Sequence, residues 1–265
     1  PIEIATVLAK YLKKDGIFED VVVANPGFLN FVLSRKWLQD QVDQMLSDPE
    51  SYGVTNAGKG KKIQVEYISA NPTGRLHVAH ARGAVIGSTL ANVLKSAGFE
   101  VEQEYYLNDA GAQIDKFNRS LVARYMQSLG NDVELPEDSY PGEDVIAVAE
   151  KIRDSSSDNY DTDDPGALSD LGKAGIQLMI EGIKEDIESL RIDFDNWFSE
   201  KSLFENGQFE KCIGLLKEMG YVGDRDGATW LLNSNLGEEK DNVLIRSNGT
   251  PTYFSTDIAY HYDKF

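Results

Sequence analysis

The chain of 265 residues is 41% hydrophobic and 26% charged, which is typical of a globular protein with one or two domains. It contains no apolar run near the ~20 residues of a membrane span, and its single cysteine, Cys212, excludes an internal disulfide and suits a reducing, cytoplasmic compartment. The net charge of −18 argues against a general nucleic-acid binder, so basic residues for such a partner would have to be concentrated locally.

Residues 1–58 combine helical and strand-like patterns. Two apolar runs, 21–23 and 28–33, flank an Asn-Pro-Gly turn and predict a hairpin. Apolar residues at helical spacing precede and follow the hairpin, at Ile4, Val7, Leu8 and Tyr11 and at Trp37, Val42 and Leu46. These patterns predict a small α+β domain.

A polar linker rich in glycine and lysine, residues 56–62, leads into the next region. Residues 53–59 match the G-x-x-x-x-G-K pattern of a P-loop. The next residue is Gly60, where a P-loop has a Ser or Thr that holds Mg²⁺, and the segment precedes a strand instead of joining a strand to a helix. We therefore interpret it as a flexible linker.

Strand and helix patterns alternate after the linker. Residues 63–68 and 101–107 are strand-like, and helical patterns cover 78–97 and then extend to about 129. Apolar residues of the first helix share one face, and Gly98 is its stop signal; they are Ile86, Leu90, Val93, Leu94 and Ala97. This order predicts right-handed βαβ units and a parallel sheet.

Residues 130–241 interrupt the alternation. The acidic stretch 155–164 predicts a mobile loop. Helical patterns follow at 171–190 and 209–219, and strand-like runs at 221–232 and 243–246. We expect 130–241 to be an insertion, and residues 242–265 to return to the main sheet.

The turn after the first strand of the sheet carries the strongest chemical signal. His77 and His80 lie three residues apart at a predicted helix start, where backbone N–H groups and the helix dipole favour phosphate. Their ring N–H groups would bind a triphosphate and stabilise charge in the transition state. A zinc site would need two more ligands, and His261 is the single further histidine, so we expect no bound metal. For an isolated H-x-x-H pair, capping or packing would be the alternative.

The segment S-A-N-P-T-G-R-L-H-V-A-H, residues 69–80, resembles the HIGH motif of class I aminoacyl-tRNA synthetases. The longer stretch V-E-Y-I-S-A-N-P-T-G-R-L-H-V-A-H-A-R-G-A-V-I-G, residues 65–87, is similar to arginyl-tRNA synthetases. The run A-N-P-G-F-L-N-F, residues 24–31, is similar to the end of their N-terminal domain, which contacts the tRNA elbow. The resemblance covers essentially the whole chain. It implies an α/β, Rossmann-like class I catalytic domain with a parallel sheet and an insertion, preceded by a small α+β domain.

The resemblance divides the chain into four parts. Residues 1–58 correspond to the tRNA-contacting domain, 61–129 to the first half of the catalytic domain, 130–241 to the insertion, and 242–265 to the return to the catalytic domain. Because Pro1 and Phe265 both lie in helical patterns, we expect a truncated fragment. The family's KMSK lysine loop and its anticodon-binding helical domain are expected beyond Phe265, so this chain alone should show no pyrophosphate exchange.

The resemblance implies that ATP is bound by Gly74, His77, Ala79 and His80, with the two histidines catalytic. The family's usual glycine is Ala79 here, and its methyl group would shift the adenine base. Some family members without the KMSK lysine carry a substitute lysine at the position of Gly74. Arg75 is a cation, but it lies one residue away and is a poorer point charge for phosphate.

Arginine binding is implied for Glu66, Ser69, Asn71, Tyr253 and Asp257. Glu66 would recognise arginine, Ser69 and Asn71 would hold the backbone of the amino acid, and the Y-x-x-x-D pair would read the guanidinium. A carboxylate can accept two parallel hydrogen bonds from that planar group. The alternatives are polar turn residues for the first three and helix capping for the last pair.

Two further residues belong to the family-like segment Y-L-N-D-A-G-A-Q, residues 106–113. Asp109 and Gln113 would line the arginine or ribose side of the pocket. Asp109 would equally serve as a helix N-cap.

The implied function is ATP-dependent ligation of L-arginine to tRNA(Arg) through arginyl-adenylate, by a cytoplasmic monomer that uses ATP with Mg²⁺ as the substrate complex. A nucleotidylyltransferase would share the H-x-x-H motif and the α/β core, but it would not need a guanidinium reader. A non-catalytic relative would keep the fold without the chemistry. Exchange of pyrophosphate into ATP with a panel of amino acids separates the three.

Overall fold

The computed structural model describes residues 1–155, 160–161 and 163–265, which form two compact units. One unit comprises Pro1–Lys61 with Leu94–Phe99, and the other comprises Lys62–Val93 with Glu100–Phe265. The predicted acidic loop at 155–164 falls largely outside the described residues. None of the described helices combines the length and the apolar character that crossing a membrane requires.

The first unit contains the predicted hairpin between two helices. Its elements are α1 (Ile2–Leu12), β1 (Phe18–Ala24), β2 (Phe28–Leu33) and α2 (Arg35–Ser47), and β1 pairs antiparallel with β2. Helix α1 buries Ala5 and Ala9, whereas the apolar face predicted for it is exposed, with Ile4 at 67% and Tyr11 at 71%. Small side chains allow a helix backbone to approach a strand closely, so helical spacing alone did not identify the packed face.

The P-loop-like sequence forms a loop between α2 and a strand. The backbone N–H of Thr55 donates to the Ser96 carbonyl and that of Gly58 to the Ala97 carbonyl, both at 2.8 Å. The loop therefore lies against the C-terminal end of a helix, and no helix follows the Gly58-Lys59 pair, as a P-loop would require.

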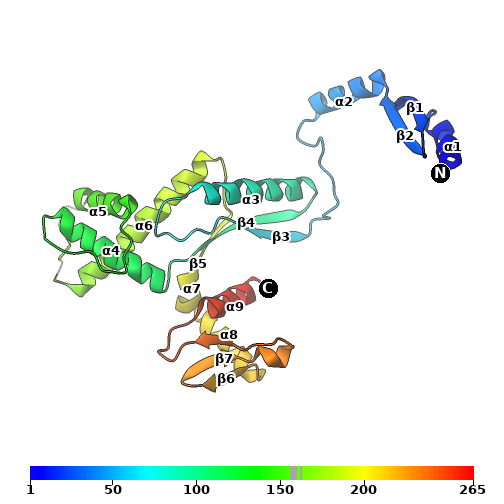
Figure 1. Cartoon of the computed structure of the whole chain (residues 1–265). Coiled ribbons are helices and arrows are strands. Elements are labelled where there is room, and N and C mark those ends of the chain that lie inside the picture. The colour runs from blue at the N-terminus through cyan, green and yellow to red at the C-terminus, as the bar shows by residue number, and fades with distance from the viewer. Residues whose placement is uncertain (156–159, 162) are drawn as a thin grey trace. The chain divides into compact units, whose positions relative to one another are not determined.

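The second unit contains the predicted parallel sheet. Its strands β3 (Lys62–Glu66), β4 (Glu100–Leu107) and β5 (Asn196–Ser199) lie in the order β3-β4-β5 (Figure 1). All pairs are parallel, with Glu66 opposite Glu104 and Leu107 opposite Ser199. The expected class of fold is confirmed.

Helix α3 (Val78–Ser96) packs on this sheet through small residues. It buries Ala84, Gly87 and Ala91, and a Cβ added to Gly87 would lie 2.2 Å from the Tyr67 ring. The apolar side chains that the sequence places on one face are instead exposed, namely Ile86 at 61%, Leu90 at 48% and Val93 at 59%. Because α3 lies so close to Tyr67, the face of α3 with small side chains must point toward the sheet.

Three helices form an apolar bundle beside the sheet. They are α4 (Ala112–Ser128), α5 (Glu143–Ser155) and α6 (Pro165–Ser189), and their core includes Phe117, Leu121, Val145 and Leu171. Helix α6 continues onto the sheet, where Ile183 and Ile187 pack with Tyr67 and Tyr105. The bundle thus connects to the turn that follows β3.

The C-terminal part has its own antiparallel sheet. It contains α7 (Glu200–Glu205), α8 (Gln208–Glu218), β6 (Val222–Arg225), β7 (Ala228–Leu231), the 3₁₀ helix Asn233–Leu236, β8 (Asn242–Ile245) and α9 (Tyr253–Lys264), with strand order β6-β7-β8.

The expected return to the main sheet at residue 242 is therefore wrong. The parallel sheet gains its third strand at β5, inside the predicted insertion, and β8 pairs antiparallel with β7. Four residues are too short to show a hydrophobic period, which is why the sequence pattern missed β5.

Candidate functional site

The turn after β3 has a constrained backbone. Ile68 and Ser69 adopt positive φ values of 67° and 43°, which non-glycine residues rarely do. Ser69 Oγ donates to Glu66 Oε1 at 2.9 Å and accepts from the Tyr106 N–H at 3.1 Å. Tyr105 Oη both accepts from the Ala70 N–H and donates to its carbonyl, each at 3.0 Å. These bonds secure the turn at the carboxyl ends of β3 and β4, where ligands of parallel sheets bind.

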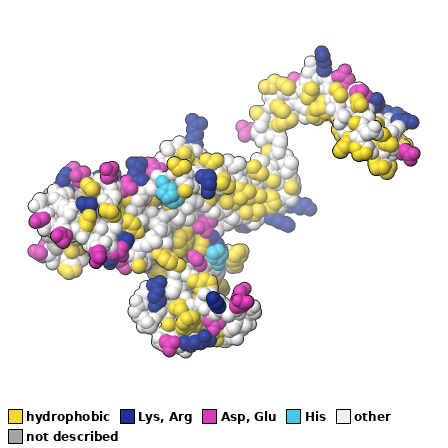
Figure 2. All heavy atoms as spheres, in the orientation of Figure 1, with side chains coloured by type: hydrophobic (Ala, Val, Ile, Leu, Met, Phe, Trp, Pro, Cys, Tyr) yellow, Lys and Arg dark blue, Asp and Glu magenta, His cyan; other side chains and the backbone are white. Residues whose placement is uncertain are grey.

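His77 and His80 stand together at the start of α3. Their rings stack with centroids 3.7 Å apart, and histidine side chains reach the surface in the space-filling view (Figure 2). Backbone N–H groups donate to both Nδ1 atoms at 3.3 Å, from Ala79 to His77 and from His77 to His80. Burial, and then the neighbouring His77, lower the pKa of His80. A neutral ring that accepts at Nδ1 carries its proton at Nε2, so Nε2–H is the group available to a phosphate oxygen.

The two histidines line a hollow of about 390 Å³, within the size range of ligand pockets. The turn after β3 provides Asn71, Thr73 and Gly74 to its wall, Tyr140 comes from the loop before α5, and Asp144 from the first turn of α5. A Cβ added to Gly74 would lie 3.7 Å from Asp144, an ordinary contact, so steric crowding does not require glycine at this position.

The guanidinium of Arg75 is paired within the protein and is therefore not free to bind phosphate. Its N–H donates to Asp144 Oδ2 at 3.1 Å, and its guanidinium pairs with Asp186 of α6 at 2.8 Å. Asp186 raises the pKa of the Arg75 guanidinium first by its hydrogen bond and then by its charge. The cation next to the hollow is thus already paired with a carboxylate.

A cluster of carboxylates lies at the end of β3, close to α9. Tyr260 Oη is 3.0 Å from Glu66 Oε2 and makes a short contact with Glu104, and Lys264 Nζ lies 3.0 Å from Glu104 Oε1. Burial raises the pKa of Asp257, His261 opposes this, and Glu66 adds to it. Glu66 and Asp257 are therefore electrostatic neighbours, although 191 positions (257 − 66) separate them in the chain.

Gln113 connects the turn after β3 to α9. Asn71 Nδ2 donates to Gln113 Oε1 at 2.5 Å, and Gln113 lies near enough to the Tyr253 hydroxyl to act on its pKa, which it lowers. Burial is the main cause that raises the pKa of Tyr253. Asn71 in turn lines the histidine hollow, so the same side chain touches both groups of predicted residues.

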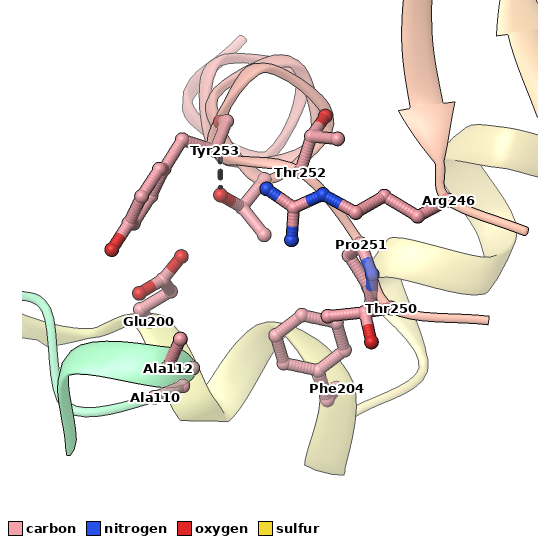
Figure 3. Close-up of a pocket in the computed structure, with 11 residues that line it drawn as sticks. Ala110, Ala112, Glu200, Phe204, Arg246, Thr250, Pro251, Thr252 and Tyr253 are labelled. Carbon is pink, nitrogen blue, oxygen red and sulfur yellow. Dashed lines mark hydrogen bonds between the residues drawn. The ribbon is translucent and has the colours of Figure 1, made fainter. Parts of the chain in front are cut away.

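A second pocket of about 300 Å³ contains residues that the sequence reasoning missed. Glu200, Tyr253 and Arg246 point into it above Phe204, and Ala110 and Ala112 border it from the start of α4 (Figure 3). Burial raises the pKa of Glu200, while hydrogen bonds with Thr256 and Tyr106 oppose that shift. Glu200 follows β5 directly, so recognising that strand would have pointed to it.

Asp109 has a capping role. Its Oδ2 accepts from Ser199 Oγ at 2.6 Å and its Oδ1 accepts from the Lys201 N–H at 3.0 Å, which caps the start of α7. Both carboxylate oxygens are therefore engaged within the protein. The other predicted residues that lie at this end of the sheet are Glu66, Ser69, Asn71, Gln113, Tyr253 and Asp257.

No group of three or more His, Cys, Asp or Glu side chains among the described residues is arranged to hold a metal ion. His261 lies on α9, with Nδ1 2.7 Å from the Asp257 carbonyl oxygen.

Two family models match the chain. One describes the catalytic domain of class I tRNA synthetases (R) and covers residues 41–264, and the other describes the arginyl tRNA synthetase N-terminal domain and covers residues 1–33. Curated arginine–tRNA ligases from Dehalococcoides mccartyi strain CBDB1 and Carboxydothermus hydrogenoformans are each 47% identical to this chain over its whole length. The alignments cover 48% of each relative, so the chain spans about half their length.

Solved structures give the same likeness. An arginyl tRNA synthetase structure from Campylobacter jejuni superposes with a TM-score of 0.77 at 34% identity, over 88% of this chain and 51% of that one. The Thermus thermophilus arginyl-tRNA synthetase shares the fold, with a TM-score of 0.59 at 23% identity, over 97% of this chain and 44% of that one.

Proposed function

Because this chain belongs to the class I arginyl-tRNA synthetases, we propose that the complete gene product joins L-arginine to tRNA(Arg) in two steps. The arginine carboxylate attacks the α-phosphorus of ATP·Mg²⁺, the bond to the β-phosphate breaks, and pyrophosphate leaves. The terminal ribose of tRNA then attacks the arginyl carbonyl, and AMP leaves. No protein nucleophile takes part, so catalysis consists of positioning and charge stabilisation.

The histidine hollow is the proposed ATP site. His77 and His80 would direct Nε2–H groups at the phosphates and stabilise the charge that develops at the α-phosphorus. Gly74 and Ala79 border the proposed site without a charged side chain. Mg²⁺ would arrive with ATP as part of the substrate.

The carboxylate cluster is the proposed arginine site. Asp257 and Tyr253 would read the guanidinium, Glu66 would supply a second negative charge, and Ser69 and Asn71 would hold the backbone of the amino acid. A planar guanidinium offers five donors, which suits carboxylates from two elements. Gln113 would act through Asn71, to which it is hydrogen-bonded, and through the neighbouring Tyr253.

Asn71 carries the argument for a single reaction centre. It lines the histidine hollow and donates to Gln113, which reaches Tyr253. An amino acid held by Tyr253 and Asp257 would therefore present its carboxylate beside the proposed phosphate site. The geometry favours adenylation of an amino acid with a cationic side chain.

The remaining parts of the proposal concern tRNA. Residues 1–58 would contact tRNA, 61–129 would form the first half of the catalytic domain, 130–241 would form the insertion, and 242–265 would belong to the catalytic domain again. The enzyme would act in the cytoplasm as a monomer.

The family assignment removes the nucleotidylyltransferase alternative, and a non-catalytic relative is distinguished by the experiment below.

The test is exchange of labelled pyrophosphate into ATP by the complete gene product with tRNA present. We expect exchange with arginine and none with citrulline, a neutral analogue of nearly the same shape. A site built to bond a charged group rejects such an analogue by about 10⁴–10⁵. Exchange with both amino acids would contradict the arginine pocket, and exchange with neither would favour the non-catalytic relative.

A further inference from the structure

The carboxylate cluster contains a buried residue, Glu104, that the reaction scheme does not use. Glu104 of β4, with a side chain 2% exposed, is the register partner of Glu66 on β3, so two carboxylates lie on neighbouring strands. A buried carboxylate is costly unless a cation and donors compensate it. Lys264 Nζ lies 3.0 Å from Glu104 Oε1, and the side-chain amides of Gln64 and Asn196 donate to Oε2 at 3.1 and 2.6 Å. Every oxygen of this carboxylate is therefore engaged.

The Tyr260 hydroxyl lies between the two carboxylates. It is 3.0 Å from Glu66 Oε2 and in short contact with Glu104 Oε1. A phenol has one hydrogen to donate, so it can serve one of these two oxygens at a time. Lys264 supplies the second donor, because its ammonium contacts Glu104 and also lies 3.6 Å from Glu66 Oε2. The shorter of the two Tyr260 contacts is with Glu104, so Lys264 is the group that can compensate both carboxylates.

The charge count of the cluster also depends on Lys264. Glu66, Glu104 and Lys264 together carry one net negative charge. Glu66 is the more exposed of the two carboxylates, with 35% of its side chain accessible against 2% for Glu104. Its Oε1 accepts from Ser69 Oγ at 2.9 Å and its Oε2 lies by Tyr260. A carboxylate held by the Ser69 hydroxyl on one oxygen and by Tyr260 and Lys264 beside the other, with one uncompensated charge in the pair, is suited to a cationic ligand.

We propose that Lys264 and Tyr260 are positioning residues that hold Glu66 in the orientation that binds the cationic amino acid. The inference rests on the proposed function in one respect, which is that Glu66 contacts arginine. Lys264 acts by its charge, because the ammonium lies 3.0 Å from Glu104 Oε1 and 3.6 Å from Glu66 Oε2, and the Tyr260 hydroxyl lies between the same two carboxylates. Without Lys264, Glu66 and Glu104 face each other with no cation between them, and their repulsion moves Glu66 out of the orientation that binds arginine.

The first test compares variants of the complete gene product in arginine-dependent pyrophosphate exchange. Lys264→Met should raise the KM for arginine about ten- to a hundredfold, the scale of a lost hydrogen bond to a charged group, with the KM for ATP unchanged. Lys264→Arg should recover most of the affinity. Lys211→Met is the matched control, because Lys211 also lies over a tyrosine ring of α9, that of Tyr262.

A double-mutant cycle separates positioning from a general loss of structure. In a Glu66→Gln background, Lys264→Met should add little to the KM for arginine if Lys264 acts through Glu66. Fold-changes that simply multiply would overturn the proposal. If Lys264→Met alone fails to fold, adding Glu104→Gln removes the unpaired buried charge and its repulsion of Glu66, so the double variant should fold and bind arginine. A double variant that folds without binding arginine would overturn the proposal.

The outcome for the wild-type protein separates this inference from the proposed function. A wild-type protein without arginine-dependent exchange would refute the proposed function. An active wild type together with an unchanged KM for arginine in Lys264→Met would leave that function standing and refute the role of Lys264.

Discussion

The histidine hollow and the carboxylate cluster are assembled in different ways. The hollow derives mainly from one continuous segment, residues 71–80, with one wall from residues 140–145 around the start of α5. The cluster joins β3, β4 and α9, whose residues Glu66, Glu104 and Tyr260 are far apart in sequence. The first arrangement can be read from a motif, and the second exists only once the chain has folded. Glu104 and Tyr260 of the cluster are buried, whereas His77 is exposed, so single substitutions in the cluster should cost more.

The largest expected effect is on the cluster. Asp257→Asn should weaken arginine binding by about 2–4 kcal/mol, the scale of losing one partner of a charge pair that the bound arginine would bury. The KM for ATP should hardly change. The measurement is the KM for each substrate in pyrophosphate exchange, with Asp263→Asn, an exposed carboxylate of the same helix, as the control. A wild-type kcat/KM for arginine would show that Asp257 does not read the substrate.

Substitutions in the histidine hollow should lower the rate of pyrophosphate exchange more than the affinity for arginine. His80→Ala should lower kcat for exchange by about 10²-fold, as expected when one donor to a developing charge is lost. The KM for arginine should change less. Val78→Ala is the control, because Val78 is 87% exposed in the same turn of α3. An equal loss of folding stability, or zinc found by metal analysis, would indicate a structural role for the histidines.

A substitution of Asp109, at the border of the cluster, distinguishes an effect on folding stability from an effect on arginine binding. Asp109→Ala removes a cap from α7 and should lower the free energy of unfolding by about 0.5–2 kcal/mol. Urea unfolding measures this, with Asp115→Ala on the exposed side of α4 as the control. The KM for arginine should stay close to the wild-type value, and a large increase would return Asp109 to the binding site.

The cluster should also show opposite pH trends for stability and binding. Burial raises the pKa of Asp257 above its ordinary value of 3.8, so the folded protein binds this proton more readily than the unfolded one. The charged form therefore opposes folding at neutral pH, and that penalty is relieved as pH falls through the raised pKa. Arginine needs the charged carboxylate, so its affinity falls over the same range.

Unfolding by urea and arginine titration between about pH 7 and pH 4 would measure both trends. Asp257→Asn should abolish the Asp257-dependent part of each. Parallel pH profiles in the wild type and the variant would contradict this interpretation.

The smallest effect is expected beside the hollow. Arg75→Ala removes an exposed ion pair with Asp186, for which the usual contribution is about 0–1 kcal/mol. Pyrophosphate exchange should be nearly unchanged, because this guanidinium is already paired. A large fall in kcat, with Arg82→Ala as the control, would identify Arg75 as the cation that meets the departing pyrophosphate.

Local patterns in the sequence predicted much of this molecule. The hairpin of β1 and β2, the strand–turn–helix unit from β3 to α3, and the parallel pairing of β3 with β4 follow from turn residues, periodicity and short connections. The motif at residues 69–80 also identified the histidine pair. These features depend on residues close in sequence, whose mutual placement the backbone restricts.

Only the tertiary structure determined which face of each helix is packed and which distant residues contact one another. Periodicity shows that Ile86, Leu90 and Val93 share one side of α3, but the close approach to Tyr67 selects the side with Ala84, Gly87 and Ala91.

The same holds for the charged groups. No sequence motif predicts the contact among Glu104, Tyr260 and Lys264. Similarly, Asp109 caps a helix that begins 91 residues (200 − 109) further along the chain. A buried charge must find its partner wherever the folded chain places one, and that choice is made by packing across the whole unit, beyond the range of any local pattern.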